Sequence, residues 1–199
     1  MIDHNPSWHN YIEASKLAFA DRNFYIADPD YVNTPDDNLL DDYYLLGRKN
    51  LIKDNAIIDN PLYGIPPNWS KDDQISGIDY NESGTTHISI IDAYGNALSM
   101  TSTIESAFGS RKMSNGYFLN NELTDFSFSS EVNGNKVANR VQGGKRPRSS
   151  MTPTIIFDPI SDKPKIIIGT AGGSRIIGYV TQRIIDMLYH EKSIMESIS

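Results

Sequence analysis

The spacing of apolar and polar residues along the chain changes near Gly84. Before it, apolar residues recur three or four positions apart, which predicts one helix over residues 8–20 and a second over residues 41–53. The Asn-Pro-Ser triplet at 5–7 is a typical helix start. The residues that recur at helical spacing in the first helix are Trp8, Tyr11, Ile12, Ala14, Ala18 and Phe19.

Between the two patterns, residues 55–84 are rich in Pro, Asn, Asp and Gly and predict a long irregular connection. After Gly84 the residues alternate, which predicts strands. The expected elements are a hairpin (86–91 and 97–103, turn 92–96), a short strand (117–119), a second hairpin (154–157 and 165–168, turn 158–162) and a helix opened by Gly172 and running to about residue 190. This order of helices and strands predicts an α+β fold in which helices flank a sheet.

Composition and charge exclude several functions. The 199 residues include no cysteine, which rules out a disulfide scaffold, a thiolate zinc site, an iron–sulfur cluster and a cysteine nucleophile. The net charge of −7 argues against nucleic-acid binding, which rests on phosphate neutralisation. No apolar run approaches the ~18 residues of a membrane span, and the first residues do not form a signal peptide. The charge also changes near Gly84: residues 1–84 hold 15 acidic and 6 basic side chains, and residues 85–199 hold 10 and 12.

Gly84, Thr85 and Thr86 lie where the irregular chain gives way to a strand. A threonine hydroxyl is a poor nucleophile without a base, but a threonine at a new N-terminus carries its own base, the α-amino group. That amine has a pKa near ~8, suited to general-base work. The alternative interpretation, which the local pattern alone favours, is a β-branched strand start.

Two other segments have a chemical and a plainer interpretation. At residues 169–174 a strand passes through glycines into a helix, where backbone N–H groups favour an anion or a developing oxyanion, although such turns also need glycine for backbone reasons. The basic run 145–148 could indicate a localisation or nucleic-acid patch; on an acidic chain it more often forms a solvated loop or supports a neighbouring site. His87 has no second histidine at metal-ligand spacing, so a packed or solvated histidine is expected.

Together these segments resemble motifs of the γ-glutamyltranspeptidase family of N-terminal nucleophile hydrolases. The resemblance is ordered along the whole chain and rests on residues 16–22, 28–30, 85–89, 92 with 95–96, 101–109, 119–126, 145–154 and 172–175. It implies an αββα N-terminal-nucleophile sandwich that is incomplete in this chain.

The resemblance implies a catalytic role for four residues. Thr85 matches the nucleophile, freed when the precursor cleaves itself between Gly84 and Thr85. Thr103 matches the threonine that hydrogen-bonds and orients that nucleophile. Gly172 and Gly173 match the pair whose amides form the oxyanion hole.

The resemblance also implies a binding site for a zwitterionic γ-glutamyl head. Ser149 and Ser150 match the hydroxyls that hold its α-carboxylate, and Asp125 matches the carboxylate that pairs with its α-ammonium. Glu105 and Glu122 stand where many members have Asn and Gln, and Glu105 can still accept a hydrogen bond from the α-ammonium. These two differences leave the substrate preference open.

By the same resemblance, residues 1–84 match the end of the large-subunit region and residues 85–199 the front of the small-subunit region. The chain therefore resembles a fragment whose missing large-subunit segment, including the arginine that binds the α-carboxylate, lies on another polypeptide or is lost. Residues 127–144 stand where the family has its lid region. A lone fragment is expected to expose sheet edges and apolar faces.

The implied activity is hydrolysis or transfer of the γ-glutamyl group of glutathione and other γ-glutamyl amides, to water or to an acceptor amino acid or peptide, in the periplasm or outside the cell. No metal or organic cofactor is expected. Two alternatives remain: a cephalosporin or glutaryl acylase of the same fold, and an inactive fragment that needs a partner polypeptide.

Overall fold

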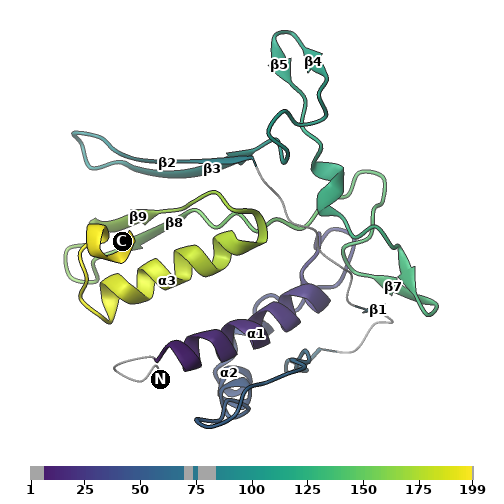
Figure 1. The fold of residues 1–199 in the computed structure, drawn as a ribbon, viewed down its shortest axis with the longest axis horizontal. Helices are drawn as coiled ribbons and strands as arrows, with labels where there is room; N and C mark the ends of the chain where they lie inside the picture. Colours follow the sequence, from purple (N-terminus) through teal and green to yellow (C-terminus); the bar gives the residue numbers. More distant parts are fainter. Residues whose placement is uncertain (1–6, 70–73, 76–83, 199) are drawn as a thin grey trace. The chain divides into compact units, whose positions relative to one another are not determined.

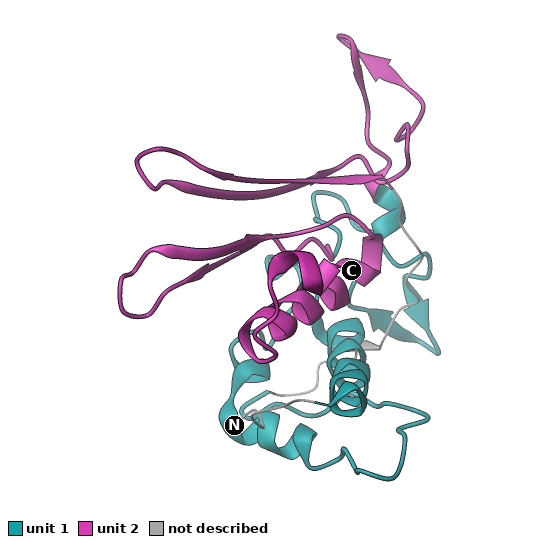
Figure 2. Cartoon of the chain, turned by 60° about the vertical axis from the view of Figure 1, so that its left-hand side comes forward, with its two compact units in different colours: residues 1–80, 123–148 teal, residues 81–122, 149–199 magenta. Residues whose placement is uncertain are grey.

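The computed structural model describes residues 7–69, 74–75 and 84–198, drawn in Figure 1. The chain forms two compact units, coloured separately in Figure 2: unit 1 comprises residues 1–80 and 123–148, and unit 2 comprises residues 81–122 and 149–199. These units group residues by contact, whereas the predicted boundary at Gly84 concerns subunit regions and stays a prediction. The helix-start residues Asn5 and Pro6 lie outside the described residues.

Unit 1 contains the two helices that the apolar spacing predicts. The helices are α1 (Trp8–Tyr25), longer than expected, and α2 (Asp42–Lys49), shorter than expected and preceded by the 3₁₀ turn η1 (Asn38–Leu40). Ser7 and Asp41 cap α1 and α2, because the side chain of each accepts a hydrogen bond from a backbone N–H of the first turn.

The buried face of α1 differs from the face that the apolar residues predict. Trp8 and Ile12 are about half exposed, at 52% and 50%, whereas Glu13, Leu17 and Asp21 are buried. Periodicity cannot identify this face, because its acidic members are buried only with partners supplied by distant segments.

Each buried carboxylate of α1 has a cation and a backbone N–H as partners. Glu13 accepts from Lys16 Nζ at 2.7 Å and from the amide of Ile58 at 2.7 Å. Asp21 lies 3.0 Å from Arg48 of α2 and accepts from the amide of Gly64 at 2.8 Å. These interactions connect α1 to α2 and to the irregular connection.

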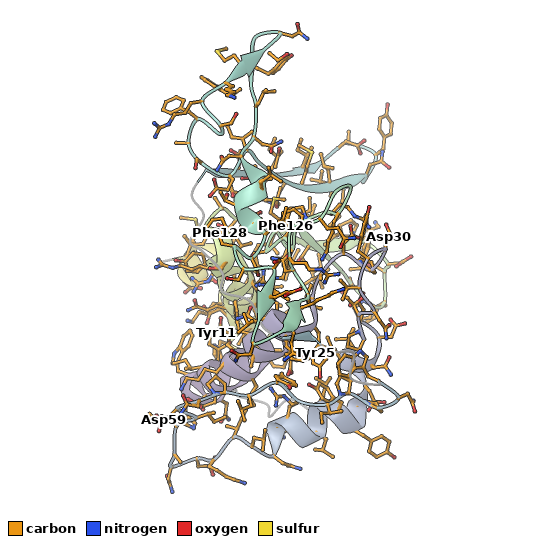
Figure 3. The ribbon with its side chains drawn as sticks, turned by 90° about the vertical axis from the view of Figure 1, so that its right-hand side faces the viewer. Tyr11, Tyr25, Asp30, Asp59, Phe126 and Phe128 are labelled. Carbon is orange, nitrogen blue, oxygen red and sulfur yellow. The ribbon has the colours of Figure 1, made fainter. Side chains whose placement is uncertain are left out.

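Residues 55–69 of that connection are irregular as predicted, yet they pack through aromatic rings, whereas residues 74–75 form a strand that was not predicted. Tyr63 stacks on Phe24 with ring centroids 3.6 Å apart. Trp69 meets Tyr25 edge-on at 4.8 Å; Tyr25, labelled in Figure 3, lies at the end of α1. An aromatic cluster therefore replaces regular structure as the means of holding this segment.

The later segment of unit 1 contains strands that were not expected. A small sheet pairs β7 (Asn135–Val137) in parallel with β1 (Gln74–Ile75) and antiparallel with β6 (Glu131–Val132). The 3₁₀ turn η2 (Glu122–Asp125) precedes it. Strands of two or three residues are too short to show an alternating pattern.

Arg146, at the centre of the basic run, joins this later segment to the chain after α1. Its guanidinium donates to both carboxylate oxygens of Asp28, at 2.7 and 3.1 Å, and to Asp30 at 2.8 Å. Its backbone N–H also donates to Asp28, at 2.8 Å. These hydrogen bonds hold the pKa of the buried Asp28 carboxyl well below its usual range.

The two flanking basic residues of the run are buried and bond to backbone carbonyls. Arg148 Nη1 donates to the carbonyls of Arg22 and Asn23, at 3.1 and 3.3 Å. Lys145 Nζ donates to the Ala138 carbonyl, and burial lowers the pKa of Lys145 to about 8. Lys145 and Arg148 therefore support the structure of unit 1 from buried positions, whereas Arg146 is an exposed, ion-paired loop residue.

Unit 2 is built from the two predicted hairpins, which extend side by side in Figure 1. In the first hairpin, β2 (Thr85–Ile91) pairs antiparallel with β3 (Ala97–Thr103). In the second, β8 (Thr154–Phe157) pairs with β9 (Pro164–Ile168). Two serine hydroxyls join the hairpins: Ser89 Oγ donates to the Ile167 carbonyl at 3.3 Å, and Ser99 Oγ to the Ile168 carbonyl at 3.0 Å.

The predicted last helix follows β9. The 3₁₀ turn η3 (Gly173–Arg175) opens α3 (Ile176–Leu188), which lies along the β8–β9 hairpin and buries Ile176 and Val180. The short helix α4 (Ile194–Ile198) ends the described chain. The predicted strand near residue 117 is β5 (Tyr117–Phe118), paired with β4 (Met113–Ser114).

Many large apolar side chains are exposed in both units, as the resemblance to a fragment leads us to expect. On the first hairpin, Ile90 and Ile91 are 50% and 57% exposed, and in unit 1 Leu40 and Tyr43 are 74% and 86% exposed. Within the described ranges, no helix combines the length and the apolar character needed to cross a membrane.

Replacing Gly47 by alanine should stabilise the chain. Gly47 lies inside α2, and a Cβ placed there meets nothing within 4 Å. An alanine in a helix interior is worth about 0.5–1 kcal/mol over glycine, largely through the unfolded state. We expect the G47A variant to raise the unfolding free energy by that amount in denaturant titrations; a decrease would contradict the description of α2.

Acid should weaken unit 1 through Asp28. Because hydrogen bonds from Arg146 depress the pKa of this carboxyl, its stabilisation is present above about pH 4 and is lost as pH falls further. We expect D28N to lower the thermal midpoint at pH 7 by several degrees and to reduce the loss of stability between pH 5 and pH 3. The exposed Asp36 provides the control, and an equal effect of D36N would contradict the role of Asp28.

Candidate active site

Thr85 and Thr103 face each other at the open end of the first hairpin. The antiparallel register pairs these two residues, and Thr85 Oγ1 donates to Thr103 Oγ1 at 3.3 Å. Thr103 Oγ1 also accepts from the backbone N–H of Glu105 at 2.9 Å. The hydroxyl of Thr85 is therefore oriented by a second hydroxyl that is itself held by the backbone.

The backbone just before Thr85 packs tightly against the chain after β3. Gly84 has a φ of +138°, a region that favours glycine. A Cβ at Gly84 would overlap the carbonyl oxygen of Glu105 and lie 2.9 Å from the carbonyl carbon of Ser106. The Gly84–Thr85 peptide bond thus has backbone neighbours on its Gly84 side and a hydroxyl neighbour on its Thr85 side.

Glu105 is buried and held by residues that the sequence did not single out. Its carboxylate oxygen Oε2 accepts from Ser106 Oγ at 2.7 Å and from Asn121 Nδ2. Asn121 Oδ1 in turn accepts from the backbone N–H of Ser106 at 3.0 Å. The only available signal for Asn121 was its place inside the family-like segment 119–126.

Gly172 and Gly173 form the turn between β9 and α3, as the glycine pattern predicts. Their φ angles are +139° and +57°, so both use conformations that favour glycine. A Cβ on Gly172 would approach the Tyr179 ring to 3.0 Å. The backbone at these two positions therefore requires glycine. The same turn also has N–H groups at a helix start, which can favour an anion.

His87 is packed between the hairpins, as expected. Its Nδ1 lies 2.8 Å from Thr101 Oγ1 and its Nε2 lies 2.9 Å from Ser89 Oγ. A Cβ on Gly169, just after β9, would overlap the His87 ring. This close approach places the strand that begins at Thr85 beside the segment that leads to Gly172.

The predicted binding residues fall in both units. Ser149 and Ser150 belong to unit 2, where Ser149 Oγ accepts from the Met151 amide at 3.1 Å and Ser150 is buried. Glu122 also belongs to unit 2, and its amide donates to Asn120 at 3.1 Å.

Asp125 belongs to unit 1, where its carbonyl accepts from Asn139 at 2.7 Å. The structure therefore brings Thr85, Thr103 and Glu105 together, whereas the joint binding site stays a prediction. Among the described residues, no group of three or more His, Asp or Glu side chains could hold a metal ion.

The arrangement of hairpins and helix occurs in a solved enzyme. Cephalosporin acylase from Bacillus halodurans matches 93% of this chain with a TM-score of 0.73, at 23% identity and over 30% of its own length. At that identity the similarity shows the fold alone.

The chain belongs to the gamma-glutamyltranspeptidase family, whose family model matches residues 2–199. The "Glutathione hydrolase proenzyme" of Bacillus subtilis strain 168 is 41% identical over 202 residues, covering 96% of this chain. This chain spans about a third of that relative, 32% of its length. "Putative inactive glutathione hydrolase 4" of Arabidopsis thaliana is 36% identical over 183 residues, covering 87% of this chain and 90% of that relative.

Replacing Gly169 by alanine should destabilise unit 2, because the new Cβ would overlap the His87 ring. Overpacking of this kind costs about 1–3 kcal/mol. We expect denaturant titration to report that loss of unfolding free energy for G169A in the wild-type chain. In an H87A background, where the ring is absent, the same substitution should cost less. Gly143 is the matched control, since a Cβ there meets nothing within 4 Å; equal effects of G143A and G169A would contradict the packing of His87.

Proposed function

We propose that this chain carries the nucleophile of a γ-glutamyl transferase and hydrolase, and that Thr85 becomes an N-terminal nucleophile by self-cleavage after Gly84. The observation that carries the proposal is the hydrogen bond from Thr85 Oγ1 to Thr103 Oγ1, next to the Gly84 backbone. The word proenzyme in the name of the Bacillus subtilis relative is consistent with a processed precursor.

Self-cleavage needs only groups of the chain and water. Thr85 Oγ1 attacks the carbonyl carbon of Gly84, the Gly84–Thr85 C–N bond breaks, and the acyl group passes from nitrogen to oxygen. Water then hydrolyses the ester, which leaves a carboxylate on Gly84 and a free α-amine on Thr85. That amine is the base that the threonine hydroxyl otherwise lacks.

In turnover, Thr85 Oγ1 attacks the γ-carbonyl carbon of glutathione or another γ-glutamyl amide. The α-amine of Thr85 takes the hydroxyl proton and delivers it to the departing amine as the C–N bond breaks. The amides of Gly172 and Gly173 stabilise the oxyanion. The acyl group then passes to water or to the amine of an acceptor amino acid or peptide.

Recognition of the γ-glutamyl head is assigned to five side chains. The hydroxyls of Ser149 and Ser150 hold the α-carboxylate, while Asp125 and Glu105 offer acceptors to the α-ammonium. Glu122, which stands where many members have Gln, completes the binding set. Fixing both charged ends positions the γ-carbonyl against the nucleophile. A glutaryl or cephalosporin substrate lacks the α-ammonium and would offer these carboxylates no cation.

The complete site requires more chain than these residues supply. The described hairpins and helices would form part of an αββα sandwich, and a further segment, on this polypeptide's full-length form or on a partner, would complete it. The expected compartment is the periplasm or the cell exterior.

A second candidate is an inactive chain. The observation that favours it is the Arabidopsis thaliana relative that this chain matches over 90% of its length and whose name includes the word inactive. Such a chain would keep the threonine pair and the packed glycine turn without building a nucleophile.

We expect the T85A variant to lose both self-cleavage and turnover, because it lacks the attacking oxygen. Intact mass and N-terminal sequencing after incubation at neutral pH should yield a product beginning Thr-Thr-His-Ile from the wild-type chain and only the uncut chain from T85A. The exposed neighbour Thr86 is the matched control, and T86A should cleave like the wild type. Cleavage by T85A would remove Thr85 from the mechanism.

Substrate preference is measured on the cleaved protein, first alone and then together with the missing large-subunit segment of the family. Hydrolysis of glutathione in preference to a glutaryl amide would support the γ-glutamyl proposal. The opposite preference would support the acylase alternative, and an uncut, inactive wild-type chain would support the second candidate.

A further inference from the structure

We propose that Asn121 is a positioning residue for the nucleophile: it fixes the loop after β3 in the one conformation that orients Thr103, and through Thr103 the hydroxyl of Thr85. This inference rests on the proposed self-cleavage after Gly84. It assigns a role to a side chain that does not touch the reacting atoms and lies well beyond Thr103 in the sequence.

Asn121 joins the loop residues Glu105 and Ser106 by its side chain. Its Nδ2 donates to Glu105 Oε2 and to Ser106 Oγ, the latter at 3.3 Å, and its Oδ1 accepts from the Ser106 backbone N–H at 3.0 Å. Its own backbone N–H donates to the Ile104 carbonyl at 3.2 Å. One amide side chain therefore closes the turn that follows β3.

The turn needs such support because Glu105 has a left-handed backbone. Its φ is +71°, a conformation that costs free energy for any residue with a Cβ. Glu105 is 8% exposed, and its carboxylate is held by Asn121 and Ser106. Strain of this kind persists where the surroundings over-determine the conformation.

The left-handed conformation directs two backbone groups of Glu105 at the cleavage site. The N–H donates to Thr103 Oγ1 at 2.9 Å, and the carbonyl oxygen packs so close to Gly84 that it would overlap a Cβ there. Thr103 Oγ1 thus accepts from both Glu105 and Thr85. Because a hydroxyl oxygen has two lone pairs, its own proton must point away, and Thr85 is kept as the donor of the pair.

The same contacts change the interpretation of Glu105. Its Oε2 already accepts two internal hydrogen bonds, so this residue acts on Thr85 through its backbone even before any substrate arrives. Because self-cleavage involves no substrate, its rate reports this positioning role and not the recognition of an α-ammonium.

The test is a compensating pair of substitutions. In N121D a second carboxylate faces Glu105 and no N–H remains to bridge them. In the N121D/E105Q double variant, the amide introduced at position 105 donates to the carboxylate introduced at position 121, and that carboxylate still accepts from the Ser106 N–H. E105Q alone keeps an amide oxygen that accepts from Asn121.

We expect N121D to slow self-cleavage by about tenfold to a hundredfold, the range that small misplacements of reacting groups produce. The double variant should recover to within a few-fold of wild type, whereas E105Q alone measures the cost of changing Glu105 itself. A loss of stability unrelated to the hydrogen bond between Asn121 and Glu105 would show no such rescue.

Asn96, in the turn of the β2–β3 hairpin that carries Thr85 and Thr103, provides a matched control. Its Nδ2 donates to Asp92 Oδ2 at 2.7 Å at the opposite, turn end, so N96D also places two carboxylates together. N96D should leave the cleavage rate within about twofold of wild type. Equal slowing by N96D and N121D, or no rescue by E105Q, would overturn the proposal.

A second readout keeps the inference separate from the proposed function. Amide hydrogen exchange of the uncut chain should show the Glu105 and Ser106 N–H groups protected in wild type, exposed in N121D and protected again in the double variant. If the wild-type chain does not cleave but follows this pattern, self-cleavage fails and the positioning role stands. If the Glu105 and Ser106 amides exchange at the same rates in wild type, N121D and the double variant, the positioning role fails.

Discussion

The antiparallel register of β2 and β3 is the constraint on which the proposed chemistry depends. It pairs Thr85 with Thr103 at the open end of the hairpin, and a shift by one residue would turn one of the two hydroxyls to the opposite face. The tight turn at Asp92 fixes this register, because its carboxylate accepts from the amides of Tyr94 and Asn96, at 2.8 and 2.9 Å. Both of these hydrogen bonds come from backbone amides, so the register does not depend on the side chain of Asn96.

The alternating segments were predictable from the sequence because each is long enough to show its period and is bounded by turn residues. The two hairpins and the helix after Gly172 follow from those signals. The strand pair β6 and β7 could not be predicted, since a strand of two or three residues has no period to detect.

The buried face of α1 and the positioning of the site escaped sequence analysis for a different reason. Glu13 and Asp21 are buried only because Lys16, Arg48 and distant backbone amides pair with them, which no local pattern reveals. Asn121 contributes by three side-chain hydrogen bonds to a loop 15 or 16 positions away. The threonine pair, by contrast, was predicted through the family resemblance, which supplied the long-range pairing that spacing alone lacks.

Unit 1 is discontinuous, and this has a consequence for a chain cut after Gly84. Residues 1–80 and 123–148 would then belong to two polypeptides, and contacts such as Asp28 with Arg146, 118 positions apart, would become contacts between chains. The two products would remain associated by non-covalent interactions alone. Their stability would then depend on protein concentration, as in any obligate heterodimer.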